Sequence, residues 1–286
     1  MNPRATRVLT RLGIGAAVLV FVCAVYTGYR ELWLRTGWTK PFVVDDVTMP
    51  SLGKIVGALF EQVSGKDESL LEFLLRASLF TAKEAFVGFV VGSLIGFLLG
   101  AMIAHFRVLQ RGLMPYVVAS QTIPILAIAP MVVVGLGNVS IGGWTPTDWI
   151  RVSVIAAYLT FFPVTVNTVR GLESADPRAI ELMRAYAASD LAVFWKLRLP
   201  SSLPYLFGAF RVAATACVVG AIVGELPSSI QGGLGGAILN FNQYYALSPE
   251  NLWATNLIAA FLGIGFFLVV VLAEKLFVHR PPEQFV

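Results

Sequence analysis

The chain has 286 residues, of which 57% are hydrophobic and 13% are charged, and its mean hydropathy is +0.75. A soluble domain this apolar would expose large adhesive patches, so the composition indicates an integral membrane protein. The formal net charge is +4, but the basic residues cluster beside apolar runs, as the positive-inside rule requires, and do not indicate a nucleic-acid partner. Cys23 and Cys217 both lie in apolar runs and are expected to be buried hydrophobes rather than a disulfide or a metal site.

The apolar runs predict an all-α polytopic fold with about six transmembrane helices in a single domain. The expected spans are residues 12–32, 80–104, 113–134, 149–169, 205–226 and 252–274. The first run is too long for a signal peptide and is expected to be retained. Basic residues flank the N-terminal run, the 105–111 connection and the C-terminal end, which predicts that both termini are cytoplasmic.

Two features of the first half of the chain predict local packing. Residues 50–64 carry apolar side chains at helical spacing inside a polar external segment, 34–75, and are expected to form an amphipathic helix on or beside the membrane. In the second span, glycine recurs every four residues and forms a stripe on one helix face. We expect this stripe to allow close packing within the bundle. Its members are Gly88, Gly92, Gly96 and Gly100.

The third span is interrupted by Pro115, Pro124 and Pro130. Interior prolines remove backbone hydrogen bonds, and membrane proteins tolerate them where the freed carbonyl groups find partners or line a cavity. Gln121 and Thr122 lie beside Pro124, so the break is either part of a substrate path or a structural kink, and the sequence favours neither. The candidate path residues are Gln121, Thr122, Pro124, Asn167, Thr215 and Glu225.

The ends of the fifth span carry two ionisable residues. Arg211 and Glu225 lie close enough to the expected interfaces for both side chains to reach the polar boundary. After this span, Gly232–Gly236 opens an external, re-entrant-like loop, 227–252, for which a flexible outer gate is favoured over a phosphate cradle.

A polar segment, residues 171–204, separates the fourth and fifth spans and is expected to be cytoplasmic. Asp176 is a favourable N-cap before Pro177, and a second start signal follows at Ser189-Asp190. Pro200 and Pro204 are expected to end the segment before the next apolar run. The segment therefore predicts two short helices joined by a bend at a membrane surface.

The sequence offers no catalytic constellation. It contains no Gly-x-x-x-x-Gly-Lys-Ser/Thr phosphate loop, no His-Glu-x-x-His and no nucleophile motif. The ionisable residues of the spans lie towards span ends, which disfavours a proton-coupled carrier. Transport driven from outside the chain fits these observations better than an enzyme or a secondary carrier.

The polar segment resembles the EAA loop of bacterial ABC importer permeases, whose pattern is Glu-Ala-Ala, three residues, Gly, nine residues, Ile-x-Leu-Pro. Glu181-Leu-Met occupies the place of Glu-Ala-Ala, Ala187 that of Gly, and Leu197-Arg-Leu-Pro200 ends the pattern. Further segments before and after it, including Phe162–Asn167 and Leu203–Arg211, are similar to the nitrate, sulfonate, taurine and bicarbonate permease group. The departures are Ala for Gly at 187 and Leu-Met for the two alanines.

The resemblance implies a non-catalytic inner-membrane subunit that works with a second permease, identical or paralogous, and two ATP-binding subunits that hold ATP and Mg²⁺. An extracytoplasmic binding protein would deliver a small solute, either a sulfonate- or nitrate-like anion or a small heterocycle. The loop would be a coupling helix that contacts the ATPase, with no cofactor or metal bound by this chain. The implied contact residues are Glu181, Arg184, Ala185, Ala187, Ala188, Ser189 and Asp190.

Two other readings remain open. A membrane scaffold could recruit a soluble partner through the same loop without transporting anything, although it would not need kinked, polar-spotted spans. A secondary carrier would transport without ATP.

Overall fold

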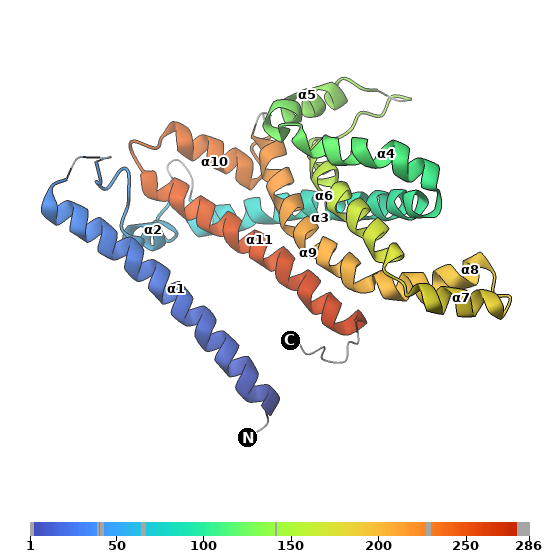
Figure 1. Cartoon of the computed structure of the whole chain (residues 1–286). Coiled ribbons are helices and arrows are strands. Elements are labelled where there is room, and N and C mark those ends of the chain that lie inside the picture. The colour runs from blue at the N-terminus through green and yellow to red at the C-terminus, as the bar shows by residue number, and fades with distance from the viewer. Residues whose placement is uncertain are drawn as a thin grey trace. The chain divides into compact units, whose positions relative to one another are not determined.

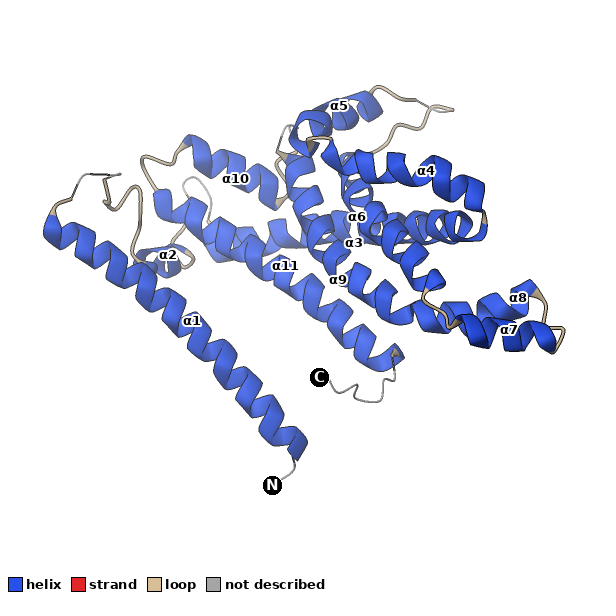
Figure 2. Cartoon of the chain, viewed as in Figure 1, coloured by secondary structure: helices blue, strands red, loops and turns tan. Residues whose placement is uncertain are grey.

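A computed structural model of the whole chain describes residues 3–38, 40, 43–63, 67–140, 142–226 and 230–278, without the side chains of residues 3–12. The predicted orientation of the spans depends on basic side chains at the two chain ends, and some of these side chains lie outside the described residues. Every regular element in the described part is a helix (Figure 2). Five of these helices are long and apolar enough to cross a membrane, or six if a bent pair counts as one span. The all-α, polytopic prediction is therefore confirmed.

The chain divides into two compact units. The first contains residues 1–73 and 240–256, and the second contains residues 74–239 and 257–286. The residue ranges of helices α3 (Leu70–His105), α10 (Leu234–Gln243) and α11 (Pro249–Phe277) each include residues of both units.

In the first unit, the long helix α1 (Pro3–Thr36) is followed by the short helix α2 (Leu52–Ala58). Ser51 caps α2 by accepting a hydrogen bond from the Lys54 N–H group. The amphipathic helix expected over 50–64 is thus only seven residues long. It tightens into i→i+3 bonds after Ala58, and the Val63 N–H group then donates to Glu68 O at 3.1 Å, so the chain turns back where a continued helix was expected.

The second unit is built around α6 (Asp148–Glu173) and α9 (Leu199–Glu225). Small side chains let these two helices approach α3 and α5 (Ile125–Gly137) closely. The shared core is formed by Ala85 from α3, Ala129 and Val133 from α5, Val152, Ile155 and Ala156 from α6, and Cys217, Val218 and Ala221 from α9. Cys217 is a buried hydrophobic residue, as expected, whereas Cys23 is only half-buried.

The glycine stripe of α3 faces α6. A methyl group added at Gly92 would lie 2.5 Å from the Ala157 carbonyl oxygen, and one added at Gly100 would lie 2.6 Å from the Thr168 Cβ atom. Such distances are shorter than any real contact, so only glycine allows this separation of the two helices. The prediction of close packing inside the bundle is confirmed.

Three of the predicted span boundaries differ from the structure. The second span begins at Leu70 rather than near residue 80, because Glu72 and Arg76 are accommodated within the helix. The third is two helices, α4 (Arg107–Ala119) with a 3₁₀ turn and α5, bent by 98°. The break falls at Pro124, while Pro115 and Pro130 lie inside helices. The fifth starts at Asp190, since α8, a π-helical turn and α9 form one continuous helix to Glu225.

The glycine-rich stretch after the fifth span is packed rather than loose. Leu234 and Gly235 open α10, and Leu234 is fully buried. Neighbouring atoms leave no space around Gly233, Gly235 and Gly236, so these three glycines of the predicted outer gate lie in close contact with the bundle.

Candidate functional site

The polar segment after α6 folds into a short helical hairpin. Helix α7 (Pro177–Ala185) begins where the sequence predicts, because the Asp176 carboxylate accepts a hydrogen bond of 2.9 Å from the Arg178 N–H group. Helix α8 (Asp190–Val193) is capped by Ser189, whose hydroxyl accepts from the Ala192 N–H group at 3.3 Å. Both predicted helix starts are confirmed. In the second unit, the hairpin lies at the end of α6 and α9 that is remote from α5 (Figure 1).

The turn between α7 and α8 depends on Ala187. This residue has a φ of 55°, in the left-handed region. The Ala188 N–H group donates to Met183 O at 3.0 Å, and the Ala187 N–H group donates to Arg184 O at 2.9 Å. These two bonds define a Schellman motif, in which the left-handed position usually belongs to glycine. The backbone thus gives a physical reason for Gly in the EAA pattern and shows that Ala187 adopts the same conformation.

The end of the hairpin differs from the prediction. Pro200 and Pro204 do not stop a helix, because Pro200 lies in the first turn of α9 and Pro204 inside it. A π-helical turn, Phe194–Arg198, precedes them, and the Leu199 N–H group reaches back to Phe194 O. The wider turn makes room for a proline, which lacks an N–H group and crowds the preceding turn of an α-helix. Any force on α8 is therefore applied to one end of a continuous 36-residue helix.

The predicted contact residues gather on this hairpin. Six of them are exposed, and Ala188 is half-buried. Four large apolar side chains, which sequence reasoning did not select, are exposed among them. These are Leu182 (59%), Tyr186 (81%), Leu191 (69%) and Trp195 (59%). The spacing of Leu182 and Tyr186, one helical turn apart on a short polar helix, was the signal that could have identified them.

A small hollow of about 180 Å³ adjoins the hairpin. Two arginines, Arg184 and Arg198, line it together with His105 from the end of α3 and Asp190 from α8. The Nε atom of Arg198 is buried and has no hydrogen-bond partner in the described part of the chain.

The candidate path residues make local contacts in the described part of the chain. Gln121, Thr122 and Pro124 lie exposed at the bend between α4 and α5, which Tyr158 of α6 fixes by donating to Ser120 O at 2.5 Å. The side chains of Thr122, Asn167 and Thr215 each donate to a carbonyl group of their own segment, at 2.8, 2.8 and 2.9 Å. These residues remain predicted path residues, and no hydrogen bond between described residues joins them.

The sequence led us to expect that the Glu225 side chain reaches a polar boundary, but it does not. It is fully buried, and Thr81 of α3 donates a hydrogen bond of 2.7 Å to its Oε1 atom. The Gly235 N–H group donates to Oε2 at 2.5 Å. Glu84, one turn after Thr81, is also fully buried. Arg211, whose side chain is 39% exposed, pairs with Glu274 of α11 at 3.4 Å.

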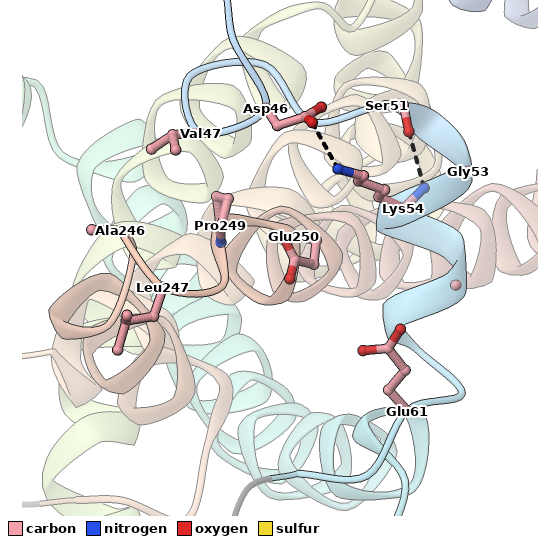
Figure 3. Close-up of a pocket in the computed structure, with 11 residues that line it drawn as sticks. Asp46, Val47, Ser51, Gly53, Lys54, Glu61, Ala246, Leu247, Pro249 and Glu250 are labelled. Atoms are coloured by element: carbon pink, nitrogen blue, oxygen red, sulfur yellow. Dashed lines mark hydrogen bonds and ion pairs between the residues drawn. The ribbon is translucent and has the colours of Figure 1, made fainter.

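The first unit contains a polar cavity of about 710 Å³ (Figure 3). Asp46, Lys54, Glu61 and Glu250 are the charged residues that line it, and Lys54 Nζ lies 2.8 Å from Asp46 Oδ2. The hydrogen bonds from Lys54 and Arg30 hold the pKa of Asp46 below its usual range. With three acidic groups and one basic group, the cavity is unsuited to anions.

The described residues contain no group of three or more His, Cys, Asp or Glu side chains placed to hold a metal ion.

The fold of the chain is that of ABC importer permeases. A solved inward-facing structure of the MetNI methionine ABC transporter superposes with a TM-score of 0.59 at 19% identity, covering 75% of this chain and all of that one. Residues 92–280 match the family described as binding-protein-dependent transport system inner membrane component. The chain belongs to this family, and the resemblance drawn from the 181–200 segment is confirmed.

Two curated relatives are similar to this chain. The formylaminopyrimidine transport permease ThiX of Halalkalibacterium halodurans is 36% identical over 139 residues, which cover 49% of this chain and 52% of the relative. The riboflavin transport system permease RibX of Chloroflexus aurantiacus is 28% identical over 232 residues, covering 81% and 80%. The alignment with ThiX thus spans about half the length of that relative. Most of the first unit, including α1 and α2, lies outside the family match.

Proposed function

We propose that this ABC importer permease receives the force of ATP hydrolysis through the hairpin of α7 and α8. The observation that carries the proposal is the exposure of Leu182, Tyr186 and Leu191 on a short polar hairpin at one end of the second unit. Exposed apolar side chains framed by charges are the usual composition of a protein docking surface. The rigid Schellman turn and the continuous helix from Asp190 to Glu225 give such a surface a direct mechanical path into the bundle.

The proposed assembly contains a second permease, identical or paralogous, two ATP-binding subunits and an extracytoplasmic binding protein. ATP and Mg²⁺ would bind to the ATP-binding subunits, because this sequence has no phosphate loop. The hairpin and both termini would face the cytoplasm of a bacterial inner membrane. Glu181, Arg184 and Asp190 would set the register of the contact by charge, and Ala185, Ala187 and Ala188 would allow a close approach.

The proposed solute is a small nitrogen heterocycle. The relatives ThiX and RibX are named for a formylaminopyrimidine and for riboflavin, both of which are nitrogen heterocycles. The predicted path residues Gln121, Asn167 and Thr215 offer amide and hydroxyl groups rather than cations, which suits a neutral ring better than a sulfonate or nitrate.

Uptake by the full assembly reconstituted in liposomes tests this proposal. We expect ATP-dependent uptake of a labelled aminopyrimidine, with little competition from an excess of an alkyl sulfonate. ATP-dependent uptake that is specific for the alkyl sulfonate instead of the aminopyrimidine would reject the heterocycle as the solute. It would leave the importer function standing. Uptake without ATP would reject the coupling role, and no uptake of any solute by an assembly that retains its ATPase would favour the scaffold.

A further inference from the structure

Glu84 is a buried acidic residue for which the proposed transport function provides no role. Its side chain on α3 has an exposed fraction of 0%, and neither carboxyl oxygen accepts a hydrogen bond from the described part of the chain. An ionised carboxylate in such a place would lose its hydration without any replacement, which is strongly unfavourable. A neutral carboxyl group avoids that cost and gains one O–H donor.

A suitable acceptor lies directly beside it. The Glu84 carboxyl group is within hydrogen-bonding reach of the Glu225 carboxyl group at the end of α9. Thr81, one turn earlier on the same face of α3, already donates to Glu225 at 2.7 Å. Two carboxyl groups can form a hydrogen bond only if one of them carries a proton, and adjacent acids commonly share a single proton for this reason.

The hydrogen bonds indicate which of the two holds the proton. Glu225 accepts from the Thr81 hydroxyl and from the Gly235 N–H group, so both of its oxygens act as acceptors. Glu84 needs an acceptor rather than a donor, because no donor in the described part of the chain reaches either of its oxygens. Glu84 is therefore the donor, and Glu225 is the carboxylate that receives its hydrogen bond.

The nearby charges are compatible with this arrangement. Lys83, on α3, is exposed, and its Nζ atom lies 4.0 Å from the centre of the Trp149 ring, over the ring face. Asp148, on α6, lies 3.1 Å from the Arg151 guanidinium group and is occupied there. Both contribute to the field at Glu84, with opposite signs.

The acidic pair also holds the first turn of α10. The Leu234 N–H group donates to the Thr81 hydroxyl at 2.9 Å, and Gly235 donates to Glu225. The N-terminal N–H groups of a helix favour a negative charge, which again places the carboxylate on Glu225. A methyl group at Gly233 would overlap the Glu225 carboxylate, and one at Gly235 would lie 2.7 Å from the Glu225 Cβ atom, so both glycines are required for this approach.

We propose that Glu84 and Glu225 form a proton-binding site. Glu84 carries one proton, and its O–H group donates a hydrogen bond to the Glu225 carboxylate. The proton, taken from water when the site forms, fixes α10 to α3 and α9 through Thr81, Leu234 and Gly235. Only the O–H bond of Glu84 forms or breaks as the site gains or loses the proton. This site is separate from the hairpin, and its role does not depend on the identity of the solute.

Infrared spectroscopy of the full chain in lipid nanodiscs at neutral pH is the test. We expect the carbonyl band of a protonated carboxyl group in the wild type, shifted by ¹³C-glutamate labelling. The band should disappear in Glu84→Gln and persist in Glu173→Gln, which changes an exposed carboxylate. Absence of the band from the wild type, or its persistence in Glu84→Gln, would overturn the proposal even if other variants failed to fold.

Hydrogen exchange provides a second readout. Glu84→Gln keeps a neutral donor of the same shape, so the Gly235 amide should exchange within about twofold of the wild-type rate, whereas Glu225→Ala should accelerate it by about tenfold or more. Equal acceleration in both variants would show that Glu84 acts only by its charge, contrary to the proposal. If Glu225→Ala fails to fold, Thr81→Val replaces it, and we expect this variant to accelerate exchange of the Gly235 amide to a smaller extent.

Discussion

Replacing Gly92 by alanine tests the packing on which the second unit is built. The new methyl group would lie 2.5 Å from the Ala157 carbonyl oxygen and 2.7 Å from the Thr160 Cβ atom, whereas ordinary contacts begin at 3.4 Å. Helices α3 and α6 would have to separate locally by about 0.9 Å. Because the obstacles include the backbone of α6, a rotamer change cannot relieve them, and overpacking of this kind costs about 1–3 kcal/mol.

A matched variant removes the confounding effect of helix propensity. Gly265 lies on α11, where an added methyl group would meet nothing within 4 Å. Alanine is favoured over glycine in a helix by up to about 1 kcal/mol at either position. The difference between Gly92→Ala and Gly265→Ala therefore reports the packing alone.

Thermal unfolding of the purified full chain in one detergent is the assay. We expect the midpoint of Gly92→Ala to lie about 2–12 °C below that of Gly265→Ala, the range that corresponds to about 1–3 kcal/mol for a chain of this size. Equal midpoints for the two variants would refute the close approach of α3 and α6.

Two further predictions concern local turns. Ala187→Gly should stabilise the hairpin by up to about 1–2 kcal/mol, because glycine has no penalty in the left-handed conformation, while Ala187→Val should destabilise it. The measurement is amide hydrogen exchange at Ala188. Exchange should be slower in the glycine variant than in the wild type, and faster exchange would count against the prediction. Hydrogen bonds from Thr48 hold the pKa of Asp45 below its usual range, so the turn is stabilised above the ordinary carboxyl pKa and loses that contribution as the pH falls through the lowered value. Exchange of the Thr48 amide, corrected for its intrinsic rate, should accelerate on acidification in the wild type but not in Asp45→Asn; an unchanged pH dependence in the variant would exclude this cause.

Local signals in the sequence were enough to predict the parts of the fold that depend on neighbouring residues. The caps at Asp176 and Ser189 start their helices as expected, since an N-cap bonds within its own turn. The glycine stripe also predicted a close helix contact, although only the structure identifies α6 as the partner. The left-handed conformation of Ala187 could be anticipated only through the glycine of the family pattern.

The features that were missed depend on distant contacts or on competing local effects. Thr81 and Glu225 are 144 residues apart, so no spacing rule could show that Glu84 and Glu225 meet. The continuity of α8 with α9 runs against the rule that proline ends a helix, because a π-helical turn accommodates Pro200. The bend at Pro124 was expected, but neither its angle of 98° nor the hydrogen bond of Tyr158 with Ser120, 38 residues away, follows from local sequence.

The central claim, that the hairpin of α7 and α8 couples this permease to an ATPase, is tested most directly by Tyr186→Ala. The control is Tyr116→Ala on α4, since Tyr116 is 75% exposed and Tyr186 is 81% exposed. The measurement is the amount of ATP-binding subunit retained by each purified variant, together with ATP-dependent uptake in liposomes. We predict that Tyr186→Ala loses about tenfold or more in retention, the effect of removing one interface hot spot, and loses uptake with it, while Tyr116→Ala retains the subunit at the wild-type level. Full retention and uptake in Tyr186→Ala would contradict the account.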